Sequence, residues 1–159
     1  MLHRRRRGGT TSEQSAPAEH DGALPAAGLG FLLAQGGGRA IRAFNRALQP
    51  FGLRSRHYMV LLVAAEAGGC SQRDLGATLD VDPSVVVSLV DDLERQGLVR
   101  RETLPADRRT RHVTATPAGA ELLERLRVLS HRVDDELTAG LDGEERGTLL
   151  ALLRRITRD

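Results

Sequence analysis

Apolar residues recur every three to four positions over most of the chain, a spacing typical of helices that bury one face. The first such stretch predicts one long helix over 27–49. Its apolar positions are Leu29, Leu32, Leu33, Ile41, Phe44 and Leu48. Three glycines at 36–38 interrupt the pattern, and each costs up to ~1 kcal/mol against alanine inside a helix. We therefore expect this helix either to bend there or to pack closely against a partner, and to end at Pro50 and Gly52.

Two shorter helices are predicted next, over 55–67 and 71–79. The apolar face of the first consists of Tyr58, Leu61, Leu62 and Ala65. The second begins with Ser71, a good N-cap residue, and Asp74 three positions later completes a pair that resembles a capping box. Leu75 and Leu79 are expected to face the interior.

A fourth helix is predicted from 83 to about 96, after a link of only three residues. Asp82 can cap it, Pro83 suits its first position, and Gly97 suits its end. Its apolar stripe, expected to pack on the two preceding helices, consists of Val86, Leu89, Val90 and Leu93.

Two short strands, 98–103 and 111–115, are predicted after this helix, joined by a polar turn over 104–110. A hairpin directly after a helix-turn-helix is a wing. A long amphipathic helix over 117–139 and a last helix capped by Asp142 complete the chain. The apolar positions of the long helix are Leu122, Leu126, Leu129, Val133 and Leu137.

Residues 1–24 carry almost no apolar side chains and include four consecutive arginines at 4–7. Such a composition predicts a disordered tail. The arginine run is either a solvated tail or cloning remnant, or an arm that attracts DNA phosphates without sequence preference.

Apolar residues make up 40% of the chain and aromatic residues only 3%, so leucine, valine and alanine must fill the core. All 23 basic residues are arginine, and with 21 acidic residues the net charge is +2, which by itself predicts no nucleic-acid partner. The exclusive use of arginine fits a GC-rich genome, and it also suits phosphate, base and minor-groove contacts.

The single cysteine, Cys70, excludes a disulfide within the chain and fits a reducing cytosol. No apolar run approaches the ~18 residues of a membrane span, and no secretory signal is present. We therefore expect a cytoplasmic protein without a membrane partner. Cys70 is more simply explained as a small buried residue than as a redox switch.

The face of the fourth helix that lies opposite its apolar stripe carries Ser84, Val87 and Ser88, with Val85 beside them. Small uncharged side chains let a helix approach base edges, where serine can hydrogen-bond and valine can contact a thymine methyl group. Further along, Asp91 and Asp92 lie where the helix is expected to leave the groove. The alternative is an ordinary solvent-facing helix, which an exposed valine disfavours.

The predicted turn of the hairpin is crowded with charge. Asp107, Arg108, Arg109 and Arg111 lie within five residues. Arginine at a hairpin tip can enter the minor groove, while Asp107 can bond to the loop backbone or orient Arg109. The alternative is a solvated charged turn, which its place directly after a capped helix-turn-helix disfavours.

Several segments together resemble the DNA-binding lobe of the MarR (multiple-antibiotic-resistance repressor) family. They are LRSRHYMVL (53–61), SQRDLG (71–76), LVDDLERQGLV (89–99), DRR (107–109) and TPAG (116–119). Each motif is weak alone, whereas their order and spacing together are specific. The resemblance implies a mainly α fold with a small β-wing, namely a winged helix-turn-helix plus a helical dimerisation lobe.

The resemblance also implies a function. The expected protein is a transcriptional repressor, associated with the nucleoid, that binds double-stranded DNA at a palindromic operator as a homodimer. The implied lobes are a first dimerisation helix (25–52), a DNA-binding lobe (53–116) and C-terminal dimerisation helices (117–159). DNA contacts are expected from Ser84, Val85, Val87 and Ser88, from the hairpin, and from Ser71, Gln72 and Arg73.

A small-molecule effector is implied in a cleft between the lobes, bordered by Arg54, His57 and Tyr58. Arg54 and His57 stand where the family often has threonine and glutamine, so the effector class does not follow from the resemblance. Asp92 stands where a basic or neutral residue is commoner. Ala115 replaces an expected leucine, which we expect to loosen the packing of the wing.

Other functional classes find little support in the sequence. There is no glycine-rich phosphate loop after a strand, no nucleophile elbow and no pair of carboxylates in an apolar setting, so we expect no enzyme and no cofactor. The five histidines are scattered without ligand spacing, so no metal site is expected. The remaining alternative is a winged-helix protein-interaction module that binds no operator.

Overall fold

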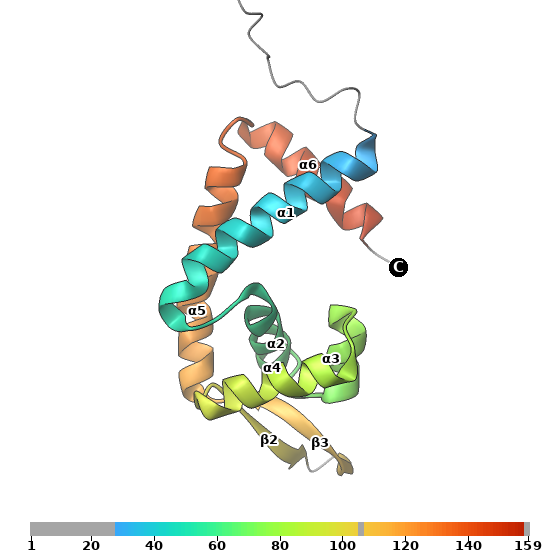
Figure 1. Ribbon diagram of the computed structural model, residues 1–159, viewed down its shortest axis with the longest axis vertical. Helices are drawn as coiled ribbons and strands as arrows, with labels where there is room; N and C mark the ends of the chain where they lie inside the picture. Colours follow the sequence, from blue (N-terminus) through green and yellow to red (C-terminus); the bar gives the residue numbers. More distant parts are fainter. Residues whose placement is uncertain (1–27, 105–106, 158–159) are drawn as a thin grey trace, which may run out of the picture.

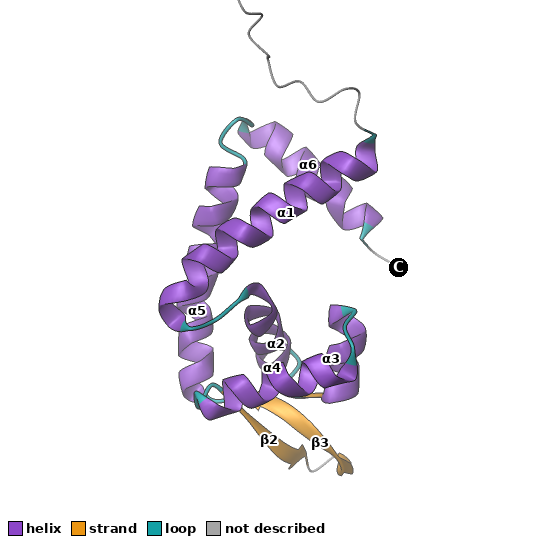
Figure 2. Ribbon diagram, in the orientation of Figure 1, coloured by secondary structure: helices purple, strands orange, loops and turns teal. Residues whose placement is uncertain are grey.

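The computed structural model describes residues 28–104 and 107–157, and of residues 104 and 107–110 only the backbone. Helices dominate, with one small sheet (Figures 1 and 2). The elements are α1 (Leu29–Leu48), η1 (Gln49–Phe51), α2 (Ser55–Glu66), β1 (Cys70–Ser71), α3 (Gln72–Leu79), α4 (Pro83–Arg95), β2 (Val99–Leu104), β3 (Asp107–Ala115), α5 (Pro117–Leu137) and α6 (Gly143–Ile156). The predicted tail over 1–24 lies outside the described residues.

Figure 1 shows two lobes joined by α5. The lower lobe holds α2, α3, α4 and the sheet, and the upper lobe is formed by α1, the end of α5 and α6. None of the described helices is long and apolar enough to cross a membrane. The mainly α fold with a small β-wing predicted from the sequence is confirmed.

The main core lies in the lower lobe, where leucine and valine dominate, as the composition predicts. The stripe of α4 is buried and packs on α2 and α3, as expected. The largest fully buried side chains are Leu48, Leu61, Leu75, Leu93, Leu123, Leu126, Val60, Val86, Val90, Val99 and Val113.

The face predicted for α2 was only partly right. Leu61 is fully buried, but the other buried positions are His57, Val60 and Ala64, while Tyr58 is half-buried. The reason is tertiary, because α2 lies between α1, α4 and α5 and is covered from several sides. A single apolar face is the pattern of a surface helix and does not describe a central one.

The sheet contains a strand that the sequence analysis missed. β1 pairs with β3 at Cys70↔Val113 and Ser71↔His112, giving the antiparallel order β1-β3-β2. A strand of two residues has no alternating pattern of its own. Cys70 and Ser71 form a strand only because β3 of the hairpin pairs with them.

The hairpin strands are longer than predicted. β3 begins at Asp107 instead of 111, so Leu104 and residues 107–110 of the expected polar turn lie within the two strands. The pairing shifts register between Thr103 and Leu104, which pairs with Asp107. The pair Leu104↔Asp107 thus extends the hairpin into a segment whose polar composition indicates a turn. Ala115, expected to loosen the wing, is half-buried against the core.

Side-chain caps fix where the helices begin, and those of Ser71 and Asp82 were predicted from the sequence. Asp74 donates its backbone N–H to the Ser71 hydroxyl at 3.1 Å, and the Asp82 carboxylate accepts the Ser84 N–H at 2.8 Å. Thr116 likewise accepts the N–H of Gly119 at 3.0 Å. These local bonds satisfy N–H groups that no helical carbonyl can reach.

The start of α5 lies directly against the entrance to β2. A Cβ atom added at Gly119 would lie 2.0 Å from the carbonyl oxygen of Leu98. The Thr116 hydroxyl also donates to the carbonyl of Gly97 at 2.7 Å. Glycine at 119 thus lets α5 approach the lower lobe closely enough to hold it.

Candidate nucleic-acid interface

The outer face of α4 presents the small side chains expected to approach DNA. Ser84, Val87 and Ser88 are exposed, and Val87 retains 43% of its surface although it is apolar. Val85 is half-buried and packs against the core, so it contributes less to this face than predicted. The buried stripe of the same helix fixes the orientation of the exposed face.

The first turn of α4 is held by its cap. The Asp82 carboxylate accepts both the N–H of Ser84 at 2.8 Å and its hydroxyl at 2.6 Å. These two bonds hold the pKa of Asp82 below its ordinary value, so the cap remains ionised at neutral pH. Ser84 is therefore oriented before any DNA binds.

The three residues at the start of α3 that were expected to contact DNA differ in the contacts that they make within the chain. Ser71 caps the helix, and its hydroxyl donates to Asp74 at 2.7 Å. Gln72 accepts a hydrogen bond from Arg101 at 2.9 Å. Arg73 is exposed and makes no hydrogen bond or ion pair within the described part of the chain, so it is the one of the three whose head group is available.

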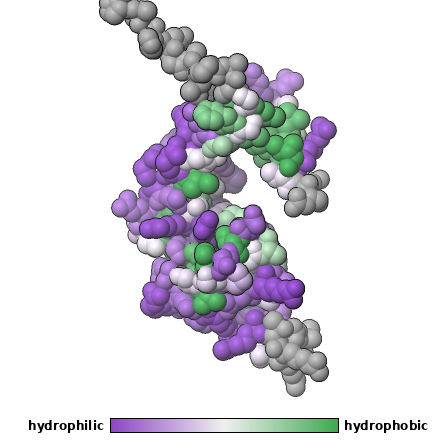
Figure 3. Space-filling model, turned by 45° about the vertical axis from the view of Figure 1, so that its right-hand side comes forward, coloured by the Kyte–Doolittle hydropathy of each residue, from purple (hydrophilic) through white to green (hydrophobic). Residues whose placement is uncertain are grey.

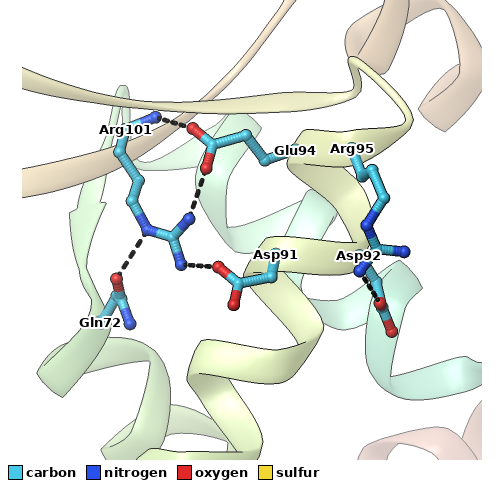
Figure 4. Close-up of polar contacts among 6 residues, drawn as sticks. All are labelled: Gln72, Asp91, Asp92, Glu94, Arg95 and Arg101. Atoms are coloured by element: carbon cyan, nitrogen blue, oxygen red, sulfur yellow. Dashed lines mark hydrogen bonds and ion pairs between the residues drawn. The ribbon is translucent and has the colours of Figure 1, made fainter.

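A cluster centred on Arg101 joins the hairpin to both helices of the helix-turn-helix (Figure 4). The guanidinium of Arg101, on β2, donates to Asp91 at 2.6 Å, to Glu94 and to Gln72. The backbone N–H of Arg101 also donates to Glu94 at 3.0 Å. Only 14% of the Arg101 side chain is exposed. The hairpin therefore keeps a fixed orientation relative to α3 and α4.

Sequence reasoning missed this cluster. Asp91 was expected only to mark where the helix leaves the groove, and Arg101 was not singled out. The available signal was weak, namely an arginine placed two residues after the buried Val99, with acidic residues at 91 and 94 on the preceding helix. Nothing local in the sequence says that these groups meet.

Asp92 takes part in a second set of contacts, which link α4 to the start of α2. Its carboxylate accepts from Arg95 at 2.8 Å and lies 3.4 Å from Nε2 of His57. The Arg95 hydrogen bond, and then that of His57, hold the pKa of Asp92 below its ordinary value. His57 Nδ1 accepts the N–H of Arg54 at 3.0 Å, which places the proton of the neutral ring on Nε2, facing Asp92.

The three residues expected to border an effector cleft do not face one common space. His57 is buried and turned toward α4, while Tyr58 packs edge-on against Phe44 of α1 with ring centroids 5.0 Å apart. Burial raises the pKa of Tyr58. Arg54 is exposed at the N-cap of α2. Residues 57 and 58 thus join α2 to two different helices, and their side chains are used in packing.

The hairpin projects from the lower end of the molecule (Figure 1). Arg111 is exposed on β3, opposite Thr103. The side chains of Asp107, Arg108 and Arg109 lie outside the described residues, although their backbone belongs to β3. At the base of the hairpin, Glu102 accepts from Thr114 at 2.7 Å and from Arg100 at 2.9 Å, which stiffens the ladder.

A groove of about 410 Å³ opens between α3 and the start of α4, next to the exposed Val87. The sequence analysis did not foresee it. Its lining is mainly apolar and consists of Gln72, Arg73, Gly76, Ala77, Val81, Pro83 and Val87. The face expected to approach DNA is therefore hollowed between the two helices.

Cys70 is 7% exposed and packs in the core, which confirms its expected role as a small buried residue. Burial, and to a lesser extent the charge of Asp74, raises the pKa of its thiol to about 11. The reactive thiolate is therefore scarce at neutral pH.

Comparisons with known proteins agree with this architecture. The sequence profile of the MarR family matches residues 51–110. The chain is 40% identical over 131 residues to a putative transcriptional regulatory protein for the hcr operon of Thauera aromatica, covering 82% of this chain and 79% of that protein.

Solved structures of MarR-family regulators also superpose on this chain. CouR from Rhodococcus jostii RHA1, bound to p-coumaroyl-CoA, superposes with a TM-score of 0.70 at 38% identity, over 80% of this chain and 90% of that one. A mutant MarR from E. coli, complexed with operator DNA, superposes with a TM-score of 0.71 at 27% identity, over 82% and 94% of the two chains.

Proposed function

Because this chain belongs to the MarR family of transcriptional regulators, we propose that it is a repressor that binds a palindromic operator as a homodimer. The observation that carries the proposal is the exposed face of α4, with its small side chains, held in fixed orientation to the hairpin by Arg101. A helix and a wing fixed to each other can read adjacent grooves of one duplex.

In this proposal, α4 enters the major groove. Ser84 and Ser88 hydrogen-bond to base edges or phosphates, and Val87 contacts a thymine methyl group. Arg73 binds phosphate from the start of α3. Arg111, together with Asp107, Arg108 and Arg109, supplies the wing contact, with an arginine in the minor groove. Asp91, Asp92 and Glu94 are paired with arginine or histidine, which reduces their repulsion of phosphates.

Dimerisation through the upper lobe is supported by apolar side chains that lack cover in the single chain. They gather over α1 and α6 (Figure 3), and α6 has no buried residue. The exposed members are Leu29, Phe31, Leu32, Leu33, Ile41, Leu149, Leu150, Leu152 and Ile156. A contiguous apolar surface of this kind marks an interface. We assign residues 25–52 and 117–159 to the dimerisation lobe and 53–116 to the DNA-binding lobe.

The glycines at 36 and 37 fit the same interface. A Cβ atom at either position would meet nothing within 4 Å in the single chain, so packing within it does not require glycine there. Close approach of a second copy supplies a reason for small residues at this part of α1.

We also propose that the protein responds to a small organic anion and has no enzymatic activity. CouR was determined bound to p-coumaroyl-CoA, which supports a response to an organic ligand, and the Thauera aromatica relative is described as a regulatory protein. A ligand changes DNA binding only if its affinity for the DNA-bound protein differs from its affinity for the free protein.

The proposal is tested by selecting bound sequences from random duplexes, with fluorescence anisotropy at two salt concentrations. We expect a palindrome with half-sites about 10 bp apart, bound more weakly at the higher salt. Failure to enrich any sequence, together with salt-independent association, would favour the protein-interaction module instead.

A further inference from the structure

A second groove, of about 370 Å³, lies in the upper lobe between α1 and α5. It is separate from Arg54, His57 and Tyr58, and no feature of the sequence analysis pointed to it. Its lining consists of Arg39, Arg42, Ala43 and Arg46 from α1, and Val133, Glu136 and Leu137 from α5.

The three arginines of α1 share one face of the helix, because they are spaced three and four residues apart. All three are exposed, and none forms an ion pair with any acid in the described part of the chain. Glu136 is the only acidic residue of the lining. Three positive charges and one negative charge leave the groove with a formal charge of +2.

Glycine at position 38 of α1 leaves room for the side chain of Arg42. A Cβ atom added at Gly38 would lie 3.1 Å from a terminal guanidinium nitrogen of Arg42. The Arg42 side chain therefore folds back over the glycine, one turn earlier on α1. This contact gives Gly38 a role that the glycines at 36 and 37 do not have in the single chain.

The remaining lining is apolar. Val133 is 8% exposed and Ala43 is half-buried, so both form part of the groove wall and not of the open surface, while Leu137 is more exposed. A volume of about 370 Å³ is within the range of small-molecule sites. The groove thus combines a doubly positive rim with an aliphatic wall.

We infer that this groove binds the phosphate-bearing part of an organic effector, an inference that rests on the proposed ligand response. Guanidinium groups bind phosphate oxygens in a two-pronged geometry, and a group with two or more negative charges balances the +2 of the lining. The aliphatic wall accommodates the carbon skeleton next to the phosphate. DNA is not the occupant, because the groove is in the upper lobe whereas the hairpin projects from the lower one (Figure 1).

The groove is connected to the DNA-reading helix by consecutive contacts. Asn45, next to Arg46, accepts the N–H of Ser55 at 2.7 Å at the start of α2. His57, in the first turn of α2, lies 3.4 Å from Asp92 of α4. An anion that draws the arginines of α1 together therefore acts on the segment that positions α2, and occupancy of the groove weakens operator binding.

The test uses the full chain and isothermal titration calorimetry with three probes: coenzyme A, pantetheine, which lacks the phosphates, and pyrophosphate, which lacks the carbon skeleton. We expect coenzyme A to bind, pyrophosphate to bind more weakly, and pantetheine not to bind. Arg42→Gln and Arg46→Gln should each weaken coenzyme A binding about tenfold. Arg56→Gln, which removes an exposed arginine of α2 outside the groove and outside the proposed dimerisation lobe, is the matched control and should change nothing.

Operator binding separates this inference from the proposed function. Without probe, the two groove variants should bind the selected operator as the unmodified chain does, and only the unmodified chain and the control should lose affinity when coenzyme A is added. Absence of coenzyme A binding, equal binding by all variants, or binding that leaves operator affinity unchanged would overturn the inference and leave the proposed function intact. Loss of operator binding in the variants without probe would assign the arginines to DNA instead.

Discussion

Arg101 is the side chain that joins the hairpin to α4. Its guanidinium is largely buried, while its partners Asp91 and Glu94 are 51% and 40% exposed, so solvent screens part of the attraction. We expect Arg101→Gln to lower the free energy of unfolding by about 1–2 kcal/mol and to weaken operator binding, because the hairpin loses its fixed orientation. Urea denaturation and anisotropy measure the two effects.

Arg100 provides the matched control for this experiment. It lies next to Arg101 on β2, and its ion pair with Glu102 is exposed, with 57% of the arginine side chain accessible. Arg100→Gln should change stability by no more than about 0.5 kcal/mol. Equal effects of the two substitutions would show that the Arg101 cluster does not orient the wing.

Gly119 is the residue at which the backbone of α5 meets that of β2. A methyl group there would lie 2.0 Å from the Leu98 carbonyl oxygen, and a backbone atom cannot rotate away as a side chain can. Gly119→Ala should therefore cost about 3 kcal/mol or more, as a forced separation of packed elements does. Thermal unfolding measures the loss.

Gly147→Ala is the corresponding control. Gly147 lies inside α6, and a Cβ atom there would meet nothing within 4 Å. Alanine should stabilise this helix by up to about 1 kcal/mol. A Gly119→Ala protein as stable as the unmodified chain would mean that α5 can move away from β2 at little cost.

At the scale of elements, Arg101 holds the hairpin and α4 together, and the proposed function has them contact DNA as one unit. We expect Arg109→Ala to cost about 1–3 kcal/mol in operator binding, because an arginine in the minor groove is lost. The fold should remain intact, as circular dichroism can verify. Unchanged affinity for the operator would remove the wing from the mechanism.

The elements themselves follow closely from local sequence. Six helices were predicted within two residues of their observed ends. Helix starts and ends are marked locally, because serine, threonine and aspartate cap free N–H groups, proline suits a first turn and glycine suits a helix end. The strands were predicted less well. β1 depends on pairing with residues of β3 about 40 positions away, which leaves no local trace, and the start of β3 pairs with Leu104 inside a segment whose composition indicates a turn.

At the scale of the whole molecule, the exposed apolar surface of α1 and α6 is the proposed dimer interface. Leu152 is 49% exposed and lies among other exposed leucines of α6. Leu152→Glu would bury an unpaired charge in the proposed interface, so we expect the dimer to dissociate and operator binding to fall sharply. Sedimentation velocity and anisotropy measure both changes.

Ala67→Glu serves as the control, because position 67 directly follows α2 in the lower lobe and is exposed, outside the proposed dimerisation lobe. It should leave the oligomeric state unchanged. A Leu152→Glu protein that stays dimeric and binds operator as before would place the dimer interface elsewhere.

The sequence by itself determined the helices, their caps, the buried stripe of α4 and the fold class, because each of these depends on residues close together along the chain. It also indicated Ser84, Val87 and Ser88 as an exposed face, which follows from helical periodicity. Only the tertiary structure decided that Gln72 and Asp91 meet Arg101, that His57 turns toward Asp92 and away from Tyr58, and that three arginines of α1 form a groove with α5. These contacts join residues that are remote in sequence, and their geometry is fixed only when the helices pack against one another.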